Sequence, residues 1–267
     1  MLSIVIPTIQ KNISVLNKLV SELVEEELIG EIIIIDNSLK GFTCNAEKVK
    51  VLTPETNLYV NPAWNFGIKN IKYEFFGILN DDILLPKNFC KQVYNFLKNN
   101  KNAGLIGLDD SIVKNTMPDD FEEYPPEADL IFSECKSHLS IRYWGSAIFG
   151  HRDNYYQIPE DIKVWCGDNF LLKKNKDNKK MNFKISGVEI KHLSSLSSGD
   201  PKFKKIKELD IHNYSKIDKA FRKRNKKHPT FLEKIFSVRN TDVKGEKTVY
   251  ILWMHFKIRL ARNNFTK

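Results

Sequence analysis

The chain has 267 residues, of which 42% are hydrophobic and 28% charged, so it can bury a core and is not disordered along its whole length. No apolar run approaches the ~20 residues of a membrane-spanning helix, so we do not expect a spanning protein. The net charge of +9 is uneven, because residues 201–267 hold 19 Lys and Arg against 6 Asp and Glu, whereas residues 1–200 hold 23 against 27.

The N-terminus and the cysteines bear on the cellular compartment. The chain does not begin with a basic segment followed by an apolar one, and Glu25, Glu26 and Glu27 occur early. The four cysteines are widely spaced and form no C-x-x-C pair, as is usual in a reducing environment. We therefore expect a cytoplasmic protein.

The first part of the chain alternates between apolar, β-branched runs and segments of helical periodicity. The predicted strands are 2–6, 32–35, 49–52, 75–79 and 103–108, and the predicted helices are 15–24 (closed by Gly30), 62–71 and a segment that begins at Pro86. Such alternation with short connections predicts an α/β fold with a mostly parallel sheet flanked by helices.

The later segments are less regular. We expect a loop over 109–129, a strand in 141–149, a helix over 166–174 and strand structure within 181–192. From 201 onward the pattern is helical and basic, and the spacing of apolar residues predicts a last helix over 248–262. This division predicts one α/β domain of residues 1–200 and a basic helical region of residues 201–267.

Polar residues follow several of the predicted strands. Thr8, Asp36, Asp81 and Asp82 each stand where a strand ends. In open α/β sheets, ligands bind beyond the carboxyl ends of the strands. We therefore expect these side chains to share one cleft.

Four short motifs occur in order at these strand ends and turns: residues 3–8 (SIVIPT), 33–38 (IIIDNS), Asn57 with 65–68 (NFGI), and 80–82 (NDD). Together they resemble the signatures of family 2 glycosyltransferases, over roughly residues 1–195. The resemblance implies the GT-A nucleotide-sugar-binding fold. The basic C-terminal extension is not explained by it.

The resemblance also implies a donor site for a nucleotide-diphosphate sugar, most simply a UDP-sugar. It is formed by Pro7, Thr8, Asp36, Asn65 and Asp81. Asp36 would accept a hydrogen bond from the N3–H of uracil, and Asp81 would lie near the ribose or the sugar. The structural alternative for Asp36 is a turn-forming residue after a strand.

The segment 80–82 is similar to the D-x-D-type metal motif of the family. The resemblance implies that Asp82 binds Mn²⁺ or Mg²⁺ and that His192 supplies a second contact. A divalent cation suits carboxylate oxygens and stabilises the charge of a departing diphosphate. The aspartates could instead belong to a turn before the helix at Pro86. The Ser/Gly-rich segment 193–199 reads as a loop that closes over the diphosphate, or as a linker.

Acceptor chemistry is assigned to the middle of the chain. By the resemblance, Asp168 is the general base that takes a proton from the acceptor hydroxyl, so that the sugar is transferred with inversion. An N-cap of the following helix is the structural alternative for Asp168, and Glu160 and Asp161 are competing bases. Trp144 and Gly145, together with Glu160 and Asp161, are the predicted acceptor contacts, and a core position is the alternative for Trp144.

The sequence thus predicts a metal-dependent, inverting glycosyltransferase that acts on a hydroxyl acceptor. A surface or lipid-linked glycan is the favoured acceptor if the basic region 201–267 lies on the anionic inner face of a membrane. A hydroxylated base in DNA is the alternative if the cluster 222–227 contacts phosphates. A nucleotidyltransferase and a non-catalytic sugar-nucleotide-binding module are the remaining functional classes.

Overall fold

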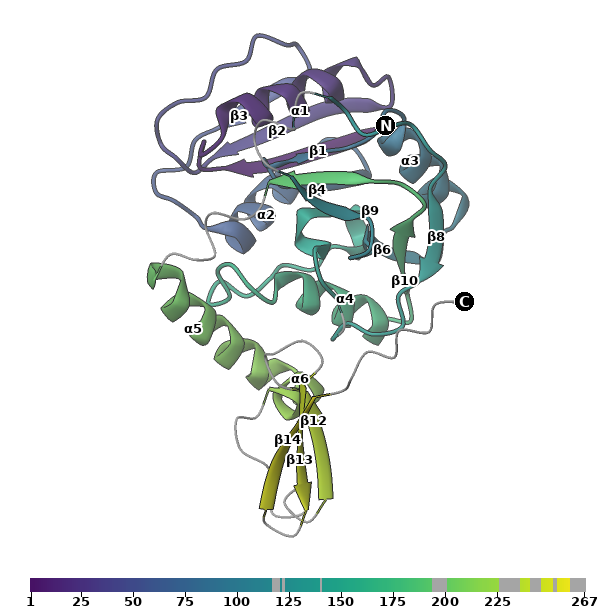
Figure 1. Cartoon of the computed structure of the whole chain (residues 1–267). Coiled ribbons are helices and arrows are strands. Elements are labelled where there is room, and N and C mark those ends of the chain that lie inside the picture. The colour runs from purple at the N-terminus through teal and green to yellow at the C-terminus, as the bar shows by residue number, and fades with distance from the viewer. Residues whose placement is uncertain are drawn as a thin grey trace. The chain divides into compact units, whose positions relative to one another are not determined.

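Figure 1 shows the computed structural model, which describes residues 1–116, 121, 123–139, 141–193, 201–225, 236–240, 246–251 and 254–259. The chain divides into two compact units, Met1–Ile217 and Asp218–Lys267. The helix that begins at Pro201 therefore belongs to the first unit, which differs from the boundary at residue 200 expected from composition.

The first unit contains a long series of alternating elements. In chain order these are β1 (Leu2–Thr8), α1 (Ile13–Glu25), β2 (Ile29–Asp36), β3 (Val49–Leu52), α2 (Val60–Lys69), β4 (Phe75–Leu79), β5 (Ile83–Leu84), α3 (Phe89–Asn99), β6 (Ala103–Leu108), β7 (Val113–Thr116), β8 (Ile131–Glu134), η2 (Trp144–Ser146), β9 (Ala147–His151), η3 (Arg152–Asn154), α4 (Gly167–Asp177), β10 (Met181–Ser186), β11 (Ile190–Leu193) and α5 (Pro201–Ile217).

The central sheet has eight strands in the order β3-β2-β1-β4-β9-β6-β10-β8. The pairs β3/β2, β2/β1, β1/β4 and β6/β10 are parallel. Strands β9 and β8 run antiparallel to their neighbours. The sheet is therefore mixed and mostly parallel, as the sequence predicted, and its carboxyl edge is formed by the ends of β1, β2 and β4.

Strand β2 shows why the centre of this sheet is apolar on both faces. Ile32, Ile33, Ile34 and Ile35 are all 0% exposed. Successive side chains of a strand point to opposite faces, so two of them pack on each side. Ile32 and Ile34 belong to the larger hydrophobic cluster, and the helices α1 and α3 cover that face.

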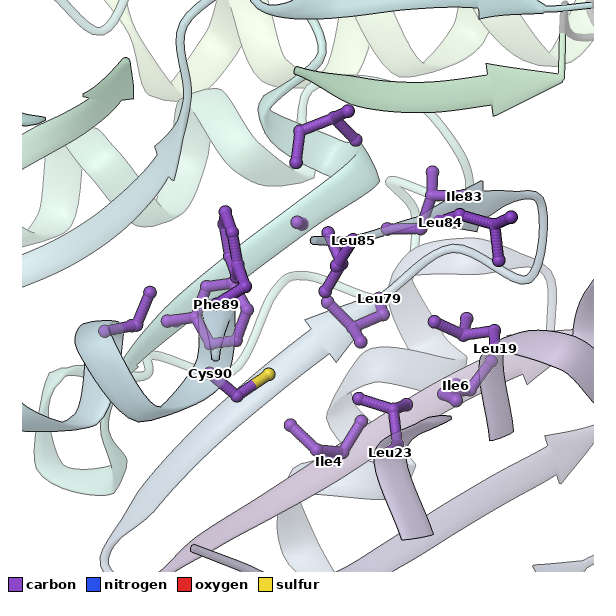
Figure 2. Close-up of a cluster of buried hydrophobic side chains, with 14 of the residues drawn as sticks. Ile4, Ile6, Leu19, Leu23, Leu79, Ile83, Leu84, Leu85, Phe89 and Cys90 are labelled. Carbon is purple, nitrogen blue, oxygen red and sulfur yellow. The ribbon is translucent and has the colours of Figure 1, made fainter. Parts of the chain in front are cut away.

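Figure 2 shows part of this cluster. Ile4 and Ile6 of β1 lie close to Leu19 and Leu23 of α1, and Phe89 at the start of α3 packs into the same layer. The apolar residues of α1 recur at helical spacing, which puts them on the side that faces the sheet. Burial of this layer holds the strand ends that carry the polar residues in place.

Helices α2 and α4 cover the opposite face of the sheet. Helix α2 contacts β1 and β2, and α4 contacts β6 and β10. Gly67 lets α2 come close to the sheet, because a Cβ atom there would lie 2.2 Å from Cγ1 of Val5. Gly67 therefore sets how closely α2 packs on β1.

A second, small sheet has the order β5-β11-β7. Strand β5 follows directly on Asp82, and His192 of β11 pairs with Ile83 of β5 in antiparallel register. This pairing joins a segment near the end of the first unit to the segment directly after β4. Strand β7 lies inside the region 109–129 that was expected to be a loop.

Two further local predictions are wrong. Gly30 does not end the first helix, which stops at Glu25; it lies in β2, where the ring of Tyr73 occupies the space of a Cβ atom. Within the predicted last helix, 248–262, the described residues 248–251 and 254–259 are strand, because the second unit contains α6 (Lys219–Arg224) followed by β12 (Phe236–Asn240), β13 (Glu246–Ile251) and β14 (Met254–Arg259).

The error in the second unit has a simple geometric reason. Val249 and Phe256 are seven residues apart, which places them on one face of a helix. The same spacing makes them direct cross-strand partners in the antiparallel pair β13/β14. The extension is therefore helical only in part. Among the described residues, no helix has both the length and the apolar character required to cross a membrane.

Candidate active site

Thr8 connects three strand ends. It lies opposite Asp36 in the parallel pair β1/β2, next to Pro7, which lies opposite Ile35. The Thr8 Oγ1 atom donates a hydrogen bond to Oδ2 of Asp81 at 2.5 Å. The structure thus brings three of the predicted donor-site residues, Thr8, Asp36 and Asp81, to one edge of the sheet.

Asp36 is fully buried, and its carboxylate accepts hydrogen bonds from the turn that follows β2. Oδ1 accepts from the backbone N–H and the hydroxyl of Ser38 at 3.0 and 2.5 Å, and Oδ2 accepts from the N–H of Gly41 at 3.0 Å. Burial alone would raise the pKa of Asp36, but hydrogen bonding from Ser38, Gln10 and Gly41 lowers it below its ordinary value. Asp36 is an ionised acceptor that also forms the turn.

Asp81 and Asp82 differ from Asp36 in their protonation. Burial raises the pKa of Asp81 to about 6, with the neighbouring Asp82 adding to the shift and the Thr8 hydroxyl opposing it. Burial likewise raises the pKa of Asp82 to about 6, against the hydrogen bond from Asn80 and the positive charge of Lys11. When two adjacent carboxyl groups are poorly solvated, ionisation of both is unfavourable unless a cation binds near them.

Asp82 and His192 lie together at the junction of β5 and β11. The distance from Asp82 Oδ1 to His192 Nε2 is 3.6 Å, and the N–H of Leu193 donates to the Asp82 carbonyl at 2.9 Å. Asp82 Oδ1 is buried without a hydrogen-bond partner. Burial lowers the pKa of His192, so the imidazole is neutral and can act as a ligand.

These two groups fit a divalent cation. Two ligand atoms at ~2.1 Å from one cation are separated by roughly 3.0–3.6 Å, which matches the observed approach. In the described part of the chain, no group of three or more His, Cys, Asp and Glu side chains forms a complete metal site. Mg²⁺-type sites commonly combine one or two protein ligands with substrate phosphates and water, so two ligands suffice for such a site.

Asp168 lies in the first turn of α4. Its Oδ1 accepts a hydrogen bond from the N–H of Asn169 at 2.8 Å, and its Oδ2 is 4.0 Å from the position a Cβ atom would take on Gly145. Burial raises the pKa of Asp168 more than the N–H groups of Asn169 and Gly145 lower it. A carboxylate with a raised pKa is a suitable general base.

The β4–β9 junction connects Asp168 to the aspartate pair. The N–H of Asn80 donates to the carbonyl of Ser146 at 2.9 Å, and Ser146 follows Gly145 in η2. The ring of Trp64 in α2 lies 3.5 Å from the Cβ position of Gly145, on the same small surface as Asp168. Gly145 therefore stands between the aspartate segment and the candidate base.

Asn61 is a residue of this region that the sequence did not reveal. Its amide donates to the carbonyls of Ile162 and Trp165 at 3.0 and 3.3 Å. A Cβ atom on Gly167 would lie 2.1 Å from Asn61 Oδ1, so only glycine fits next to it. Asn61 also carries a buried oxygen without a partner. In the sequence, an Asn at the start of a helix looks like a capping residue, so nothing indicated that Asn61 contacts this loop.

Tyr59, just before α2, has an uncommon backbone conformation with φ 63° and ψ −160°, a region in which side chains other than glycine are strained. Its carbonyl accepts a hydrogen bond from Asn37 Nδ2 at 3.0 Å, its N–H donates to Asn57 Oδ1 at 2.7 Å, and Lys163 lies over its ring. Asn37, which follows Asp36, thus ties the end of β2 to α2.

Several predicted site residues have other roles. Trp144 is 0% exposed and packs on Gly107, where a Cβ atom would lie 2.3 Å from its ring, so it cannot stack on an acceptor sugar. Asn65 donates to the Ile158 carbonyl at 2.8 Å and accepts from the Tyr155 hydroxyl at 2.9 Å. Its amide is engaged by the loop after η3 rather than free to contact a donor.

Glu160 and Asp161 are exposed in the loop before α4. The Asp161 carbonyl accepts from Asn213 of α5 at 2.8 Å. Among the described residues, no hydrogen bond or ion pair joins the side chains of Glu160 and Asp161 to Asp168, Asp81 or Asp82. Their role in acceptor binding therefore stays a prediction. The predicted closing loop, 194–199 in particular, lies outside the described residues, as do Lys226 and Lys227 of the basic cluster.

Comparison with known proteins places the chain among sugar-transferring enzymes. Residues 3–179 match the family model described as Glycosyl transferase family 2. Among solved structures, S. aureus TarS 1–349 superimposes with a TM-score of 0.52 at 16% identity, covering 84% of this chain and 68% of TarS 1–349. GalNAc-T7 with UDP, GalNAc and Mn²⁺ gives a TM-score of 0.60 at 14% identity, covering 84% of this chain and 50% of GalNAc-T7.

A further TarS 1–349 structure, in complex with UDP-GlcNAc, gives a TM-score of 0.54 at 16% identity, covering 84% of this chain and 69% of that one. At these levels of sequence identity, the structural similarities show a shared fold. No curated protein matched the chain by sequence.

Proposed function

The chain belongs to glycosyl transferase family 2 and is a glycosyltransferase, and from this premise we propose that it transfers a hexose or pentose from a UDP-sugar to a hydroxyl acceptor with inversion. The observation that carries the proposal is the approach of Asp82 to His192 beside the hydrogen-bonded pair Thr8–Asp81. UDP and UDP-GlcNAc are bound by the structural relatives GalNAc-T7 and TarS, which supports a UDP-sugar donor.

The donor half of the reaction uses the carboxyl edge of the sheet. Asp36, ionised and held by the turn at Ser38 and Gly41, would accept the N3–H of uracil. Asp81, held by Thr8, would contact the ribose or the sugar. Pro7 shapes the end of β1 beside them. Asn65 does not enter this half, because its amide serves the loop at Ile158.

Asp82 and His192 are the residues that would hold Mn²⁺ or Mg²⁺, which is consistent with the Mn²⁺ present in the GalNAc-T7 structure. Bound there, the cation would neutralise the charge that develops on the departing diphosphate. The neutral imidazole of His192 and the unpartnered Oδ1 of Asp82 are prepared for this contact.

The acceptor half depends on Asp168. It would take the proton of the acceptor hydroxyl while that oxygen attacks the anomeric carbon on the face opposite the diphosphate, which inverts the configuration. Burial raises the pKa of Asp168 above its ordinary value, which makes the carboxylate a stronger proton acceptor. Gly145, with no side chain, leaves room for the reacting groups between Trp64 and Asp168.

For the acceptor itself we propose a surface or lipid-linked glycan at the inner face of a membrane. The excess of Lys and Arg in residues 201–267 supports an anionic partner, and Arg222, Lys223 and Arg224 are exposed on α6. A hydroxylated base in DNA is the alternative acceptor, because DNA phosphates would attract the same basic residues. Anionic vesicles and hydroxymethylated DNA should therefore be offered separately to the full chain, since binding to either weakens with salt.

The test of the proposed function is a screen of nucleotide sugars for thermal stabilisation with Mn²⁺ and with EDTA, followed by hydrolysis assays. We expect a UDP-sugar to stabilise the protein most, only with Mn²⁺, and to be turned over slowly. Equal stabilisation in EDTA without any turnover would favour a non-catalytic binding module. For the variant Asp82→Ala, the matched control is Asp177→Ala, which removes a surface carboxylate of α4 that is paired with Lys173.

A further inference from the structure

Helix α5 holds the loop that leads into Asp168, although α5 lies outside the matched region 3–179. Asp210 of α5 is 1% exposed. Its Oδ1 accepts a hydrogen bond from the N–H of Lys163 at 2.8 Å, and its Oδ2 accepts from the N–H groups of Val164 and Trp165 at 2.8 and 2.9 Å. Three consecutive backbone donors thus converge on one buried carboxylate, and hydrogen bonds to a charged acceptor are among the stronger ones.

The same face of α5 touches this loop at two more places. Phe203 packs edge-on against the ring of Trp165 at 6.1 Å, and the Lys207 ammonium lies 5.8 Å from that ring. Asn213 donates to the carbonyl of Asp161 at 2.8 Å. Residues three and four apart lie on one side of a helix, so Phe203, Lys207 and Asp210 form one stripe facing the loop.

Helix α2 holds the other side of the loop backbone. The N–H groups of Val60 and Asn61 donate to the carbonyl of Lys163 at 3.1 and 2.9 Å, and the Asn61 amide donates to Ile162 and Trp165. Helix α2 therefore satisfies the carbonyl groups of Ile162, Lys163 and Trp165, and Asp210 satisfies the N–H groups of residues 163–165. A backbone held from both sides has little freedom to shift.

This held segment ends three residues before the candidate base. Between Trp165 and Asp168 stand Cys166, whose φ is 66°, and Gly167, which is packed against Asn61. We propose that Asp210 is a positioning residue that sets the orientation of Asp168 through the loop backbone. This inference rests on the proposed function, because it requires Asp168 to be the base. A misplacement of about 1 Å at a reacting group can lower the rate by about 100-fold.

The experiment uses the full chain with Asp210→Asn and Asp210→Glu, and Glu208→Gln as the control. Glu208 is an exposed carboxylate on the same helix. The probe is the UDP-sugar that gives the largest thermal shift, and hydrolysis is measured together with hydrogen exchange of the segment 160–170. We expect Asp210→Asn to lower kcat by about 10- to 100-fold with the donor KM within about two-fold of wild type. We also expect the amides of Lys163, Val164 and Trp165 to exchange at least about tenfold faster, and Asp210→Glu to restore part of kcat.

A double variant separates a positioning role from a general one. If Asp210 acts through Asp168, then Asp168→Asn with Asp210→Asn should be no more than about two-fold slower than Asp168→Asn alone, because residues that act as a unit are not additive. A wild-type kcat in folded Asp210→Asn overturns the inference, and so does a loss that appears in the donor KM alone. If Asp210→Asn does not fold, a wild-type kcat in Asp210→Glu, which displaces the carboxylate by one methylene, overturns it. If Asp168→Asn itself keeps full activity, the base assignment has failed, which is a different result.

Discussion

The Oδ1 atom of Asp82 and the Nε2 atom of His192 are 3.6 Å apart, although the two residues are distant in the sequence. The antiparallel pairing of β5 with β11 produces this approach. Neither atom has the hydrogen-bond geometry to satisfy the other, and Asp82 Oδ1 has no other partner. A buried carboxylate oxygen without a hydrogen-bond partner is unfavourable beside a neutral imidazole, unless both groups bind the same cation. We therefore expect substitutions of Asp82 and His192 to affect metal binding.

Asp82→Ala should abolish Mn²⁺-dependent binding of UDP, and His192→Gln should weaken it by about tenfold, since Gln keeps polarity but removes the imidazole ligand. Isothermal titration with UDP in Mn²⁺ and in EDTA measures both effects. The control Asp177→Ala should bind like wild type. Unchanged Mn²⁺ dependence in Asp82→Ala would remove the pair from the metal site.

Asp168→Asn should reduce sugar transfer by at least about 100-fold while leaving the affinity for UDP within about two-fold of wild type. The amide is close in shape to the carboxylate and can still accept the hydrogen bond from Asn169, but it cannot take a proton. Single-turnover assays with the UDP-sugar and titration with UDP check the two parts separately. Near-normal transfer in this variant would eliminate Asp168 as the base.

The pH dependence of stability should reveal the raised pKa of the half-buried Asp81. Its pKa in the folded state is about 6, whereas the ordinary value is 3.8. The folded protein therefore holds a proton that the unfolded chain releases between these two values, so this group stabilises the fold below pH 3.8 and that contribution is lost as the pH rises through 6.

Asp81→Asn removes this titration and can still accept the hydrogen bond from Thr8. In EDTA, the difference in melting temperature between Asp81→Asn and wild type should therefore grow in favour of the variant from pH 4 to pH 7. Thermal unfolding at several pH values gives this difference directly. A difference that stays constant over the range would show that Asp81 ionises as an ordinary carboxylate.

Gly167→Ala should destabilise the protein by about 1–3 kcal/mol, because the new methyl group would meet Asn61 Oδ1 at a distance that no real pair of atoms adopts. Gly145→Ala is the comparison, since its methyl group would make only ordinary contacts with Trp64 and Asp168. Urea unfolding should show a smaller loss for Gly145→Ala.

Shortening the side chain of Asn61 tests whether its contact with the new methyl group causes the destabilisation. Combining Gly167→Ala with Asn61→Ala should cost less than the sum of the two single changes, because the smaller side chain makes room for the methyl group. If the losses in the free energy of unfolding are strictly additive, there is no steric conflict between the introduced methyl group and Asn61.

The sequence alone was sufficient for features that depend on local periodicity and composition. The strands β3, β4 and β6 begin and end at the residues predicted, and the isoleucines of β2 are buried on both faces, because apolar β-branched runs fit only a covered strand. The topological rule for parallel sheets also placed Thr8, Asp36 and Asp81 at one edge, as the structure has them. These results follow from properties that a short stretch of chain carries by itself.

Only the tertiary structure decided which partner each residue meets. The pairing of Val249 with Phe256 fits a helix or a hairpin equally well by spacing, and the burial of Trp144 depends on Gly107, a distant residue with no side chain. Likewise, nothing near Asp210 in the sequence indicates that three N–H groups of the loop before Asp168 converge on it. Local spacing reports periodicity, whereas the energy of a buried polar or aromatic group is set by neighbours that the chain brings in from far away.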